Sequence, residues 1–226
     1  MDPNAGKRTL ANKLSREELQ AKLDAETFQR TTVSFYKYVI IENPQELRDA
    51  LFAQWSQWDC LGRIYVSREG INAQMNVPQH HWDVFDAFIH GIEYFHDVPF
   101  KLAVTDKTEG KSFLKLVVKV REQIVADGLQ PEDYDVTDVG AHLTAKDWNE
   151  AIEKHDPVVV DMRNHYESEI GHFEGAVLPE AETFREELPM VLEKLKGQED
   201  RKILLYCTGG IRCEKTSAYL KHHGFN

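Results

Sequence analysis

The sequence predicts two mixed α/β domains, an α+β domain over residues 33–125 and a parallel α/β domain over residues 141–226. The first is indicated by strand and helix patterns that follow one another in the order β-α-β-β-α-β. The second is indicated by a strand, a glycine-bearing loop and a helix at residues 202–225, an arrangement typical of a parallel α/β sheet. Between them, residues 126–140 are acidic and have no apolar periodicity, so we expect a linker there.

Residues 1–32 are expected to form a helical extension before the first domain. The stretch SREELQAKLDAETFQR has Ser15 at the place of a helix N-cap and Glu18 three residues later. This spacing is typical of a capping box, in which each side chain accepts a hydrogen bond from the backbone N–H of the other residue.

The elements of the first domain follow from apolar periodicity and turn residues. We expect, in chain order, a strand at 33–41, a helix at 44–58, strands at 62–67 and 71–77, a helix at 78–92, and strands at 100–105 and 113–120. Arg68-Glu69-Gly70 is the expected hairpin turn between the two middle strands. This order is ferredoxin-like, and the last strand pair accounts for one additional element.

Both predicted helices of this domain carry aromatic residues at helical spacing. Such spacing favours core packing over a base-stacking platform. The residues concerned are Trp55, Trp58, Trp82, Phe85 and Phe88.

Cys207 is the candidate reactive residue of the second domain. It ends a four-residue apolar run and is followed by the loop Thr208-Gly209-Gly210-Ile211-Arg212 and a helical pattern. A thiol at this place lies under a helix N-terminus, where free backbone N–H groups and the positive end of the macrodipole converge. The paired glycines let N–H groups turn inward, and Arg212 adds a fixed cation. All three features favour the thiolate, so we expect Cys207 to be a nucleophile.

The length of this loop helps to distinguish phosphoryl transfer from persulfide chemistry. Four residues separate Cys207 from Arg212. Cysteine-dependent phosphatases have one residue more, which makes room for a phosphoryl group. The shorter loop resembles that of the rhodanese family, which holds a sulfur atom as a persulfide on the cysteine.

A second motif upstream supports the same resemblance. Residues 158–176 resemble the rhodanese signature in which a strand ends in Asp-x-Arg and a Gly-His-x-x-Gly-Ala turn follows. The matching residues are Asp161, Arg163, Gly171, His172, Gly175 and Ala176. Because functional groups gather at the carboxyl ends of parallel strands, we expect Asp161 and Arg163 to support the active-site loop. The alternative is a purely structural ion pair at the strand end.

Composition sets wider limits. A chain of 226 residues with 42% hydrophobic and 29% charged residues is typical of a soluble globular protein. No apolar run approaches the roughly 18–20 residues of a membrane span, and the first twenty residues lack the apolar segment of a signal peptide. Three cysteines without framework spacing favour a reducing compartment, so we expect the cytoplasm. The net charge of −11 argues against general affinity for nucleic acids.

The full set of motifs resembles one family more closely than rhodaneses in general, namely the bacterial oxygen-dependent tRNA uridine hydroxylases. The resemblance runs from about residue 31 to residue 226 and rests on five strings: SFYKY (34–38), REGINAQ (68–74), KVREQIVADG (119–128), DMRNHYESEIGHF (161–173) and YCTGGIRCEK (206–215). It implies hydroxylation of the wobble uridine of tRNA, at position 34, to 5-hydroxyuridine. Molecular oxygen would be the co-substrate, and Cys207 the active-site cysteine and a candidate persulfide carrier.

Two other functions compete with this hypothesis. One is a persulfide sulfurtransferase that acts on a small thiol or a protein acceptor. The other is a non-catalytic binding module, which the intact Cys207 and Arg212 disfavour. No flavin, haem or metal motif is visible in the sequence, so the cofactor is unknown and no metal ligand is assigned. The expected partner is tRNA, no membrane is expected, and the oligomeric state is open.

The rhodanese-like domain is expected to be truncated at its C-terminus. A rhodanese sheet normally continues with a further strand after the helix that follows the cysteine loop. The sequence ends at His223-Gly224-Phe225-Asn226, where that strand would begin.

The other two cysteines have different expected roles. Cys60 follows an amphipathic helix of the first domain and is expected to be structural. Cys213 lies six residues after Cys207. We expect it either to pack against the loop or to resolve an oxidised Cys207 as a disulfide, which requires Cα atoms within about 7 Å.

Overall fold

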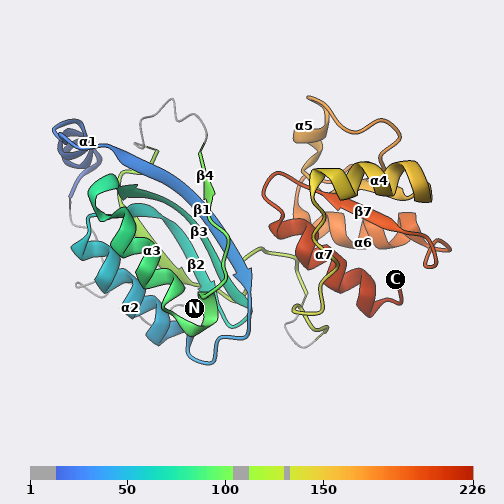
Figure 1. Ribbon diagram of the computed structural model, residues 1–226, viewed down its shortest axis with the longest axis horizontal. Coiled ribbons are helices and arrows are strands. Elements are labelled where there is room, and N and C mark those ends of the chain that lie inside the picture. The colour runs from blue at the N-terminus through green and yellow to red at the C-terminus, as the bar shows by residue number, and fades with distance from the viewer. Residues whose placement is uncertain (1–13, 104–111, 130–132, 226) are drawn as a thin grey trace. The chain divides into compact units, whose positions relative to one another are not determined.

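The computed structural model describes residues 14–103, 112–129 and 133–225, and the chain forms two compact units, Met1–Ile124 and Val125–Asn226 (Figure 1). Each unit has its own β-sheet and its own cluster of buried apolar side chains. Parts of the expected N-terminal extension, of the strand expected at 100–105 and of the expected linker lie outside the described residues, as does Asn226.

The first unit is a five-stranded sheet with the strand order β4-β1-β3-β2-β5. All neighbouring strands are antiparallel except β2 and β5, which are parallel. This topology confirms the predicted ferredoxin-like order, with β5 as the additional element beside β2. Its elements are α1 (Arg16–Asp24), β1 (Arg30–Tyr38), α2 (Pro44–Gln57), β2 (Leu61–Ser67), β3 (Gly70–Pro78), α3 (Trp82–His90), β4 (Lys101–Leu102) and β5 (Leu116–Val120).

The boundaries around Pro78 differ from the prediction. The helix predicted from residue 78 begins as α3 only at Trp82, because Pro78 has an extended backbone and still pairs with Arg30 in the β1–β3 ladder. A short 3-10 turn, Gln79–His81, leads from the strand into the helix. Pro78 therefore ends strand β3 and is not the first residue of helix α3.

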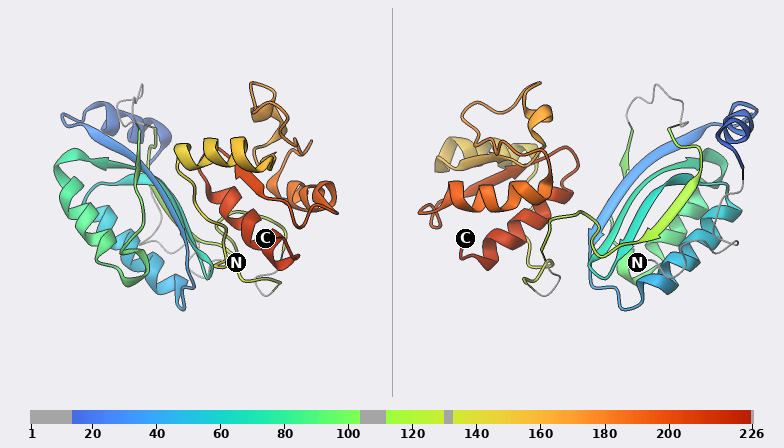
Figure 2. Two further views of the ribbon diagram at one scale, coloured as in Figure 1. Left: turned by 45° about the vertical axis from the view of Figure 1, so that its right-hand side comes forward. Right: turned by 180° about the vertical axis from the view of Figure 1, so that it is seen from behind.

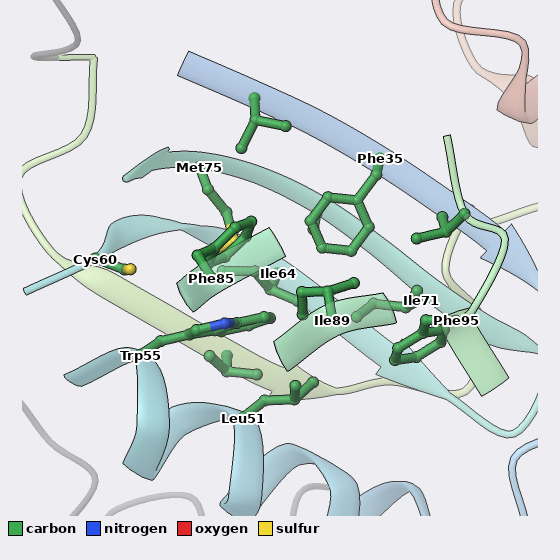
Figure 3. Close-up of a cluster of buried hydrophobic side chains, with 14 of the residues drawn as sticks. Phe35, Leu51, Trp55, Cys60, Ile64, Ile71, Met75, Phe85, Ile89 and Phe95 are labelled. Carbon is green, nitrogen blue, oxygen red and sulfur yellow. The ribbon is translucent and has the colours of Figure 1, made fainter. Parts of the chain in front are cut away.

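α2 and α3 cover one face of this sheet, and the core lies between them and the strands (Figure 1). Figure 3 shows the buried side chains, among them Trp55 of α2 and Phe85 of α3, whose rings lie 6.1 Å apart. Trp58, Trp82 and Phe88 pack half-buried against the same cluster. The predicted aromatic core is confirmed, and aromatic burial on this scale makes a large contribution to folding.

The predicted capping box at the start of α1 is also confirmed. The backbone N–H of Glu18 donates to the Ser15 hydroxyl over 3.2 Å, and the backbone N–H of Ser15 donates to the Glu18 carboxylate over 2.7 Å.

The second unit contains a two-stranded parallel sheet, β6 (Val158–Asp161) and β7 (Ile203–Tyr206). Asp161 pairs with Tyr206, so the carboxyl ends of both strands lie side by side and the residues that follow them meet. Figure 2 shows α6 and α7 beside these strands, and their apolar faces share one buried cluster with β6. The helices are α4 (Ala145–His155), α5 (His165–Ser168), α6 (Phe184–Leu195) and α7 (Ile211–His222).

A buried ion pair fastens residues 125–129 to α7. The Lys215 ammonium lies 2.7 Å from an Asp127 carboxylate oxygen, and the exposed fractions of these side chains are 1% and 0%. Lys215 also donates to the Val125 carbonyl over 3.1 Å, and the Tyr134 hydroxyl donates to Asp127 over 3.2 Å. Part of the stretch expected as a linker is thus anchored in the second unit, at the helix that follows the cysteine loop.

Candidate active site

Cys207 lies directly after β7 and beneath the first turn of α7. The backbone N–H of Gly210 donates a hydrogen bond to the Cys207 sulfur over 3.0 Å. A hydrogen bond from the Cys213 thiol is the main cause that lowers the pKa of Cys207 to about 5. Backbone N–H groups of Cys213 and Gly209 and the charge of Arg212 add to this effect, while burial of the sulfur opposes it. Cys207 is therefore a thiolate at neutral pH.

The two glycines of the loop have different roles. Gly210 is the N-cap of α7 and has a left-handed backbone with φ of 88°, which turns its N–H toward the sulfur. Residues with a Cβ rarely adopt this conformation, so the position favours glycine. At Gly209, by contrast, an added Cβ would meet nothing within 4 Å.

Arg212 is held by a carboxylate that the sequence reasoning did not identify. Its Nη1 lies 3.0 Å from the Glu167 carboxylate and 3.3 Å from the Asn164 amide oxygen. The Thr208 hydroxyl donates to the same carboxylate over 2.6 Å. Burial by itself would raise the pKa of Glu167, but hydrogen bonds from Arg212 and Thr208 and the charge of Arg212 together outweigh it, and the pKa is lowered. The Glu167 carboxylate thus connects Thr208 and Arg212, the two ends of the loop that follows Cys207.

Asp161 and Arg163 form a bidentate ion pair at the end of β6. The Arg163 guanidinium donates to both Asp161 carboxylate oxygens, over 2.8 and 2.7 Å. It also donates to the Gly171 carbonyl over 2.6 Å. The Tyr206 hydroxyl donates to Asp161 over 2.8 Å and accepts from the Phe173 N–H over 3.2 Å. The pair therefore fixes the turn that carries the Gly-His motif, next to the cysteine loop.

Aromatic side chains border the approach to Cys207. The Phe173 ring lies 4.8 Å from that of Tyr206 and 5.7 Å from that of Trp148, measured between ring centroids. One pocket is lined by Trp148, Tyr206, Cys207, Gly210 and Cys213 among others. A second is lined by Arg163, Gly171, His172, Phe173, Tyr206, Cys207 and Thr208.

Glu187 is a buried acid in the first turn of α6. It is 1% exposed, and neither carboxyl oxygen has a hydrogen-bond partner among the described residues. Burial raises the pKa of Glu187 to about 8, and the negative charges of Asp161, Cys207 and Glu167 add to this shift against the opposing charge of Arg212. Glu187 is consequently a neutral acid near neutral pH.

The structure brings the predicted site residues together within the second unit, whereas Cys60 belongs to the first. Cys207, its loop from Thr208 to Arg212, and the pair Asp161–Arg163 all lie at the carboxyl ends of β6 and β7. Cys60 is buried in the first unit, where desolvation raises its pKa to about 12. Its environment is that of an inert structural thiol.

Glu167 and Glu187 were not predicted from the sequence, and Cys213 was predicted beside the loop but not as a hydrogen-bond donor to Cys207. Glu167 stands three residues after Asn164, a capping-box spacing that marks the start of α5 and was available as a signal. Glu187 has the ordinary appearance of an acidic residue in the first turn of a helix, so no signal revealed its burial. The hydrogen bond from the Cys213 thiol follows only from the three-dimensional loop.

Within residues 14–103, 112–129 and 133–225, no three His, Cys, Asp or Glu side chains are grouped closely enough to hold a metal ion. The described helices include none that is both long and apolar enough to cross a membrane.

A thiolate at the end of a parallel strand, in a six-residue loop that closes with arginine, defines a rhodanese-like domain. Residues 144–226 match the rhodanese-like domain family. Residues 30–124 match the family described as UPF0176 acylphosphatase-like domain. The chain thus belongs among proteins that join a UPF0176 N-terminal domain to a rhodanese-like domain.

Three curated relatives of this chain share one name. The chain is 56% identical to the tRNA uridine(34) hydroxylase of Leptospira interrogans serogroup Icterohaemorrhagiae serovar Lai, over 97% of this chain and 59% of that protein. It is 48% identical to the protein of the same name from Salmonella newport, over 96% of this chain and 62% of the relative. It is 46% identical to the protein of the same name from Photorhabdus laumondii, over 96% of this chain and 61% of that protein. The chain spans about three fifths of the length of these relatives.

Proposed function

We propose that this protein is a tRNA-modifying enzyme that hydroxylates uridine 34 to 5-hydroxyuridine with molecular oxygen, using Cys207 as its reactive group. The observation that carries the proposal is the identity of 46–56% to proteins named tRNA uridine(34) hydroxylase, across 96–97% of this chain and both of its domains. In this proposal tRNA is the partner and the cytoplasm is the place of action.

The site supplies a chemical group suited to such a reaction. Backbone N–H groups and Arg212 stabilise negative charge on the Cys207 sulfur, so the residue is a nucleophile without a separate base. The aromatic rings of Phe173 and Tyr206 stand beside it. Planar bases stack on such rings, at about 1–3 kcal/mol per base. A uridine lifted from its neighbours would find both a stacking surface and the thiolate at the same place.

A sulfurtransferase is the alternative, because the same donors that hold a thiolate would also hold the terminal sulfur of a Cys207 persulfide. The two functions differ in the modified nucleoside that depends on the gene. Bulk tRNA from a strain that lacks the gene should be digested to nucleosides and compared with the parent strain by mass spectrometry.

We expect loss of 5-hydroxyuridine and of the 5-alkoxyuridines derived from it. Wild-type protein and Cys60→Ala should restore them, and Cys207→Ser should not. Cys60 is the matched control because it is a buried cysteine outside the site. Unchanged 5-hydroxyuridine with loss of a thiolated nucleoside would refute the hydroxylase and support the sulfurtransferase.

A further inference from the structure

The Cys213 thiol is in direct contact with the reactive sulfur. Cys213 is the third residue of α7, and both its thiol and its backbone N–H are hydrogen-bonded to the Cys207 side chain. Neither cysteine is in a disulfide. Both side chains line the same pocket and pack against the same apolar cluster of the second unit. A disulfide requires Cα atoms within about 7 Å and side chains that face each other, and two thiols that share a hydrogen bond meet the second of these requirements.

The protonation states of the two residues are complementary. Cys207 is the thiolate. The hydrogen bond to Cys207, burial and the negative charge of Cys207 raise the pKa of Cys213 well above its usual value and keep Cys213 protonated. The pair therefore shares one proton. A thiolate beside a neutral thiol is the reduced form of a dithiol couple, in which either sulfur can be oxidised and the other can then attack it.

We propose that Cys207 and Cys213 form a redox-active dithiol, which supplies the two electrons that hydroxylation by O2 requires. This inference rests on the proposed function. Conversion of the uridine C5–H bond to C5–OH removes two electrons from the substrate, whereas reduction of O2 to that hydroxyl and one water consumes four. Two electrons must come from another donor, and formation of one disulfide releases two.

The step balances in atoms and charge. Uridine, O2, the Cys207 thiolate, the Cys213 thiol and one solvent proton give 5-hydroxyuridine, one water and a Cys207–Cys213 disulfide. The C5–H, O–O and S–H bonds break. The C5–O and S–S bonds form, together with the O–H bond of the new hydroxyl and both O–H bonds of the water. One oxygen atom goes to the base and the other leaves as water, which carries the Cys213 proton and the solvent proton. A small-molecule or protein thiol then reduces the disulfide for the next turnover.

A single-turnover experiment on the intact protein tests this role. Enzyme that has been reduced and freed of external thiol is mixed with unmodified substrate tRNA and O2. Product is counted as 5-hydroxyuridine by nucleoside mass spectrometry, and the Cys207–Cys213 disulfide by peptide mapping after alkylation of free thiols. We expect one disulfide for each 5-hydroxyuridine, with no further product until a thiol reductant is added.

Two variants separate the redox role from the hydrogen bond. Cys213→Ser keeps a hydroxyl donor toward Cys207 but cannot form a disulfide, and we expect it to lose the product of the single turnover. Cys60→Ala should behave as wild type. In Cys213→Ser, the rate of Cys207 alkylation as a function of pH checks that the thiolate persists. Thermal unfolding of the same variant checks that the fold persists. A further variant, Lys221→Met, removes an exposed side chain of the same helix and controls for general changes in α7.

The outcomes are distinct for the two proposals. If Cys213→Ser hydroxylates tRNA with wild-type yield, the dithiol is not the electron donor, and the proposed function stands. If wild-type product forms without the disulfide, the inference is likewise overturned. If wild-type enzyme makes no 5-hydroxyuridine even with excess thiol reductant, the proposed function fails, and the electron-donor role fails with it.

Discussion

Arg212 and Glu167 form an ion pair across the mouth of the cysteine loop, with 3.0 Å between Nη1 and the carboxylate. They are 45 residues apart in the chain and come together because β6 and β7 are parallel neighbours. The pair holds the guanidinium in place beside Cys207, so its positive charge acts on the sulfur at a fixed position. Thr208 hydrogen-bonds to the same carboxylate and completes the closure.

Replacing Arg212 should weaken the thiolate. In Arg212→Ala the cation that helps to lower the pKa of Cys207 is gone, so that pKa should rise from about 5 toward its usual value. The rate of Cys207 alkylation by iodoacetamide between pH 4 and 9 measures it. Arg201→Ala, which removes an exposed arginine paired with Asp156, is the control. An unchanged titration midpoint in Arg212→Ala would show that the backbone donors and Cys213 suffice.

Removing Arg163 should disturb both the fold and the site. Arg163→Ala leaves the fully buried Asp161 with fewer donors and frees the Gly171 carbonyl. Loss of one partner of a buried ion pair typically costs about 3–5 kcal/mol of stability. We expect a value near the low end of this range, because Arg163 is partly exposed. Hydroxylation should fall because the turn at residues 171–173 loses its anchor. Arg163→Lys keeps the charge but not the bidentate geometry. Its stability and its activity should lie between those of wild type and Arg163→Ala. Urea unfolding and tRNA nucleoside analysis measure the two effects, and wild-type values in both would contradict the supporting role.

The elements of the site that were predictable from sequence are those coded by short strings. Cys207, its glycine loop and Arg212 are contiguous, and the Asp-x-Arg pair follows directly on an apolar run. The strand end and the helix N-terminus follow from this local pattern and do not depend on contacts with distant parts of the chain. The aromatic core of the first unit was predictable for the same reason, because helical spacing is a local property.

The remaining contacts depend on residues far apart in the chain. Glu167 reaches Arg212, and Asp127 reaches Lys215, only after the strands and helices have packed. An acidic stretch such as residues 126–140 has the composition of a solvated linker, so the full burial of Asp127 has no local signature. The start of α3 was displaced by a similar cause, since pairing between β1 and β3 extends through Pro78.

The Asp127–Lys215 pair should be important for the stability of the second unit. Lys215→Met leaves the Asp127 carboxylate buried without its cation, which typically costs about 3–5 kcal/mol. Lys221→Met is a matched control on the same helix, because Lys221 pairs with the exposed Asp138 and such a surface pair contributes about 0–1 kcal/mol. Urea unfolding followed by tryptophan fluorescence compares the two variants. Equal losses of stability would mean that the buried pair contributes no more than the exposed one.

Glu187 should make the stability of the protein depend on pH between about pH 5 and pH 8. Its pKa in the folded state is about 8, against an ordinary value of 4.5, so the folded protein keeps a proton that the unfolded chain releases. The free energy of unfolding therefore falls as pH rises from about 5 to about 8, and levels off above that. Glu187→Gln cannot ionise and should escape this fall. From pH 5 to pH 9 its stability relative to wild type should increase by roughly 3–5 kcal/mol, since one pKa unit corresponds to about 1.4 kcal/mol.

The measurement is urea unfolding of both proteins at several pH values, with Glu193→Gln as the control. Glu193 is on the same helix with a side chain that is 77% exposed, so its replacement should leave the pH profile parallel to that of wild type. Because the Cys207 thiolate contributes to the raised pKa of Glu187, Cys207→Ser should lower that pKa, and the fall in stability should then level off at a lower pH than in wild type. A constant difference between Glu187→Gln and wild type from pH 5 to pH 9 would show that this carboxyl group is not held as a neutral acid.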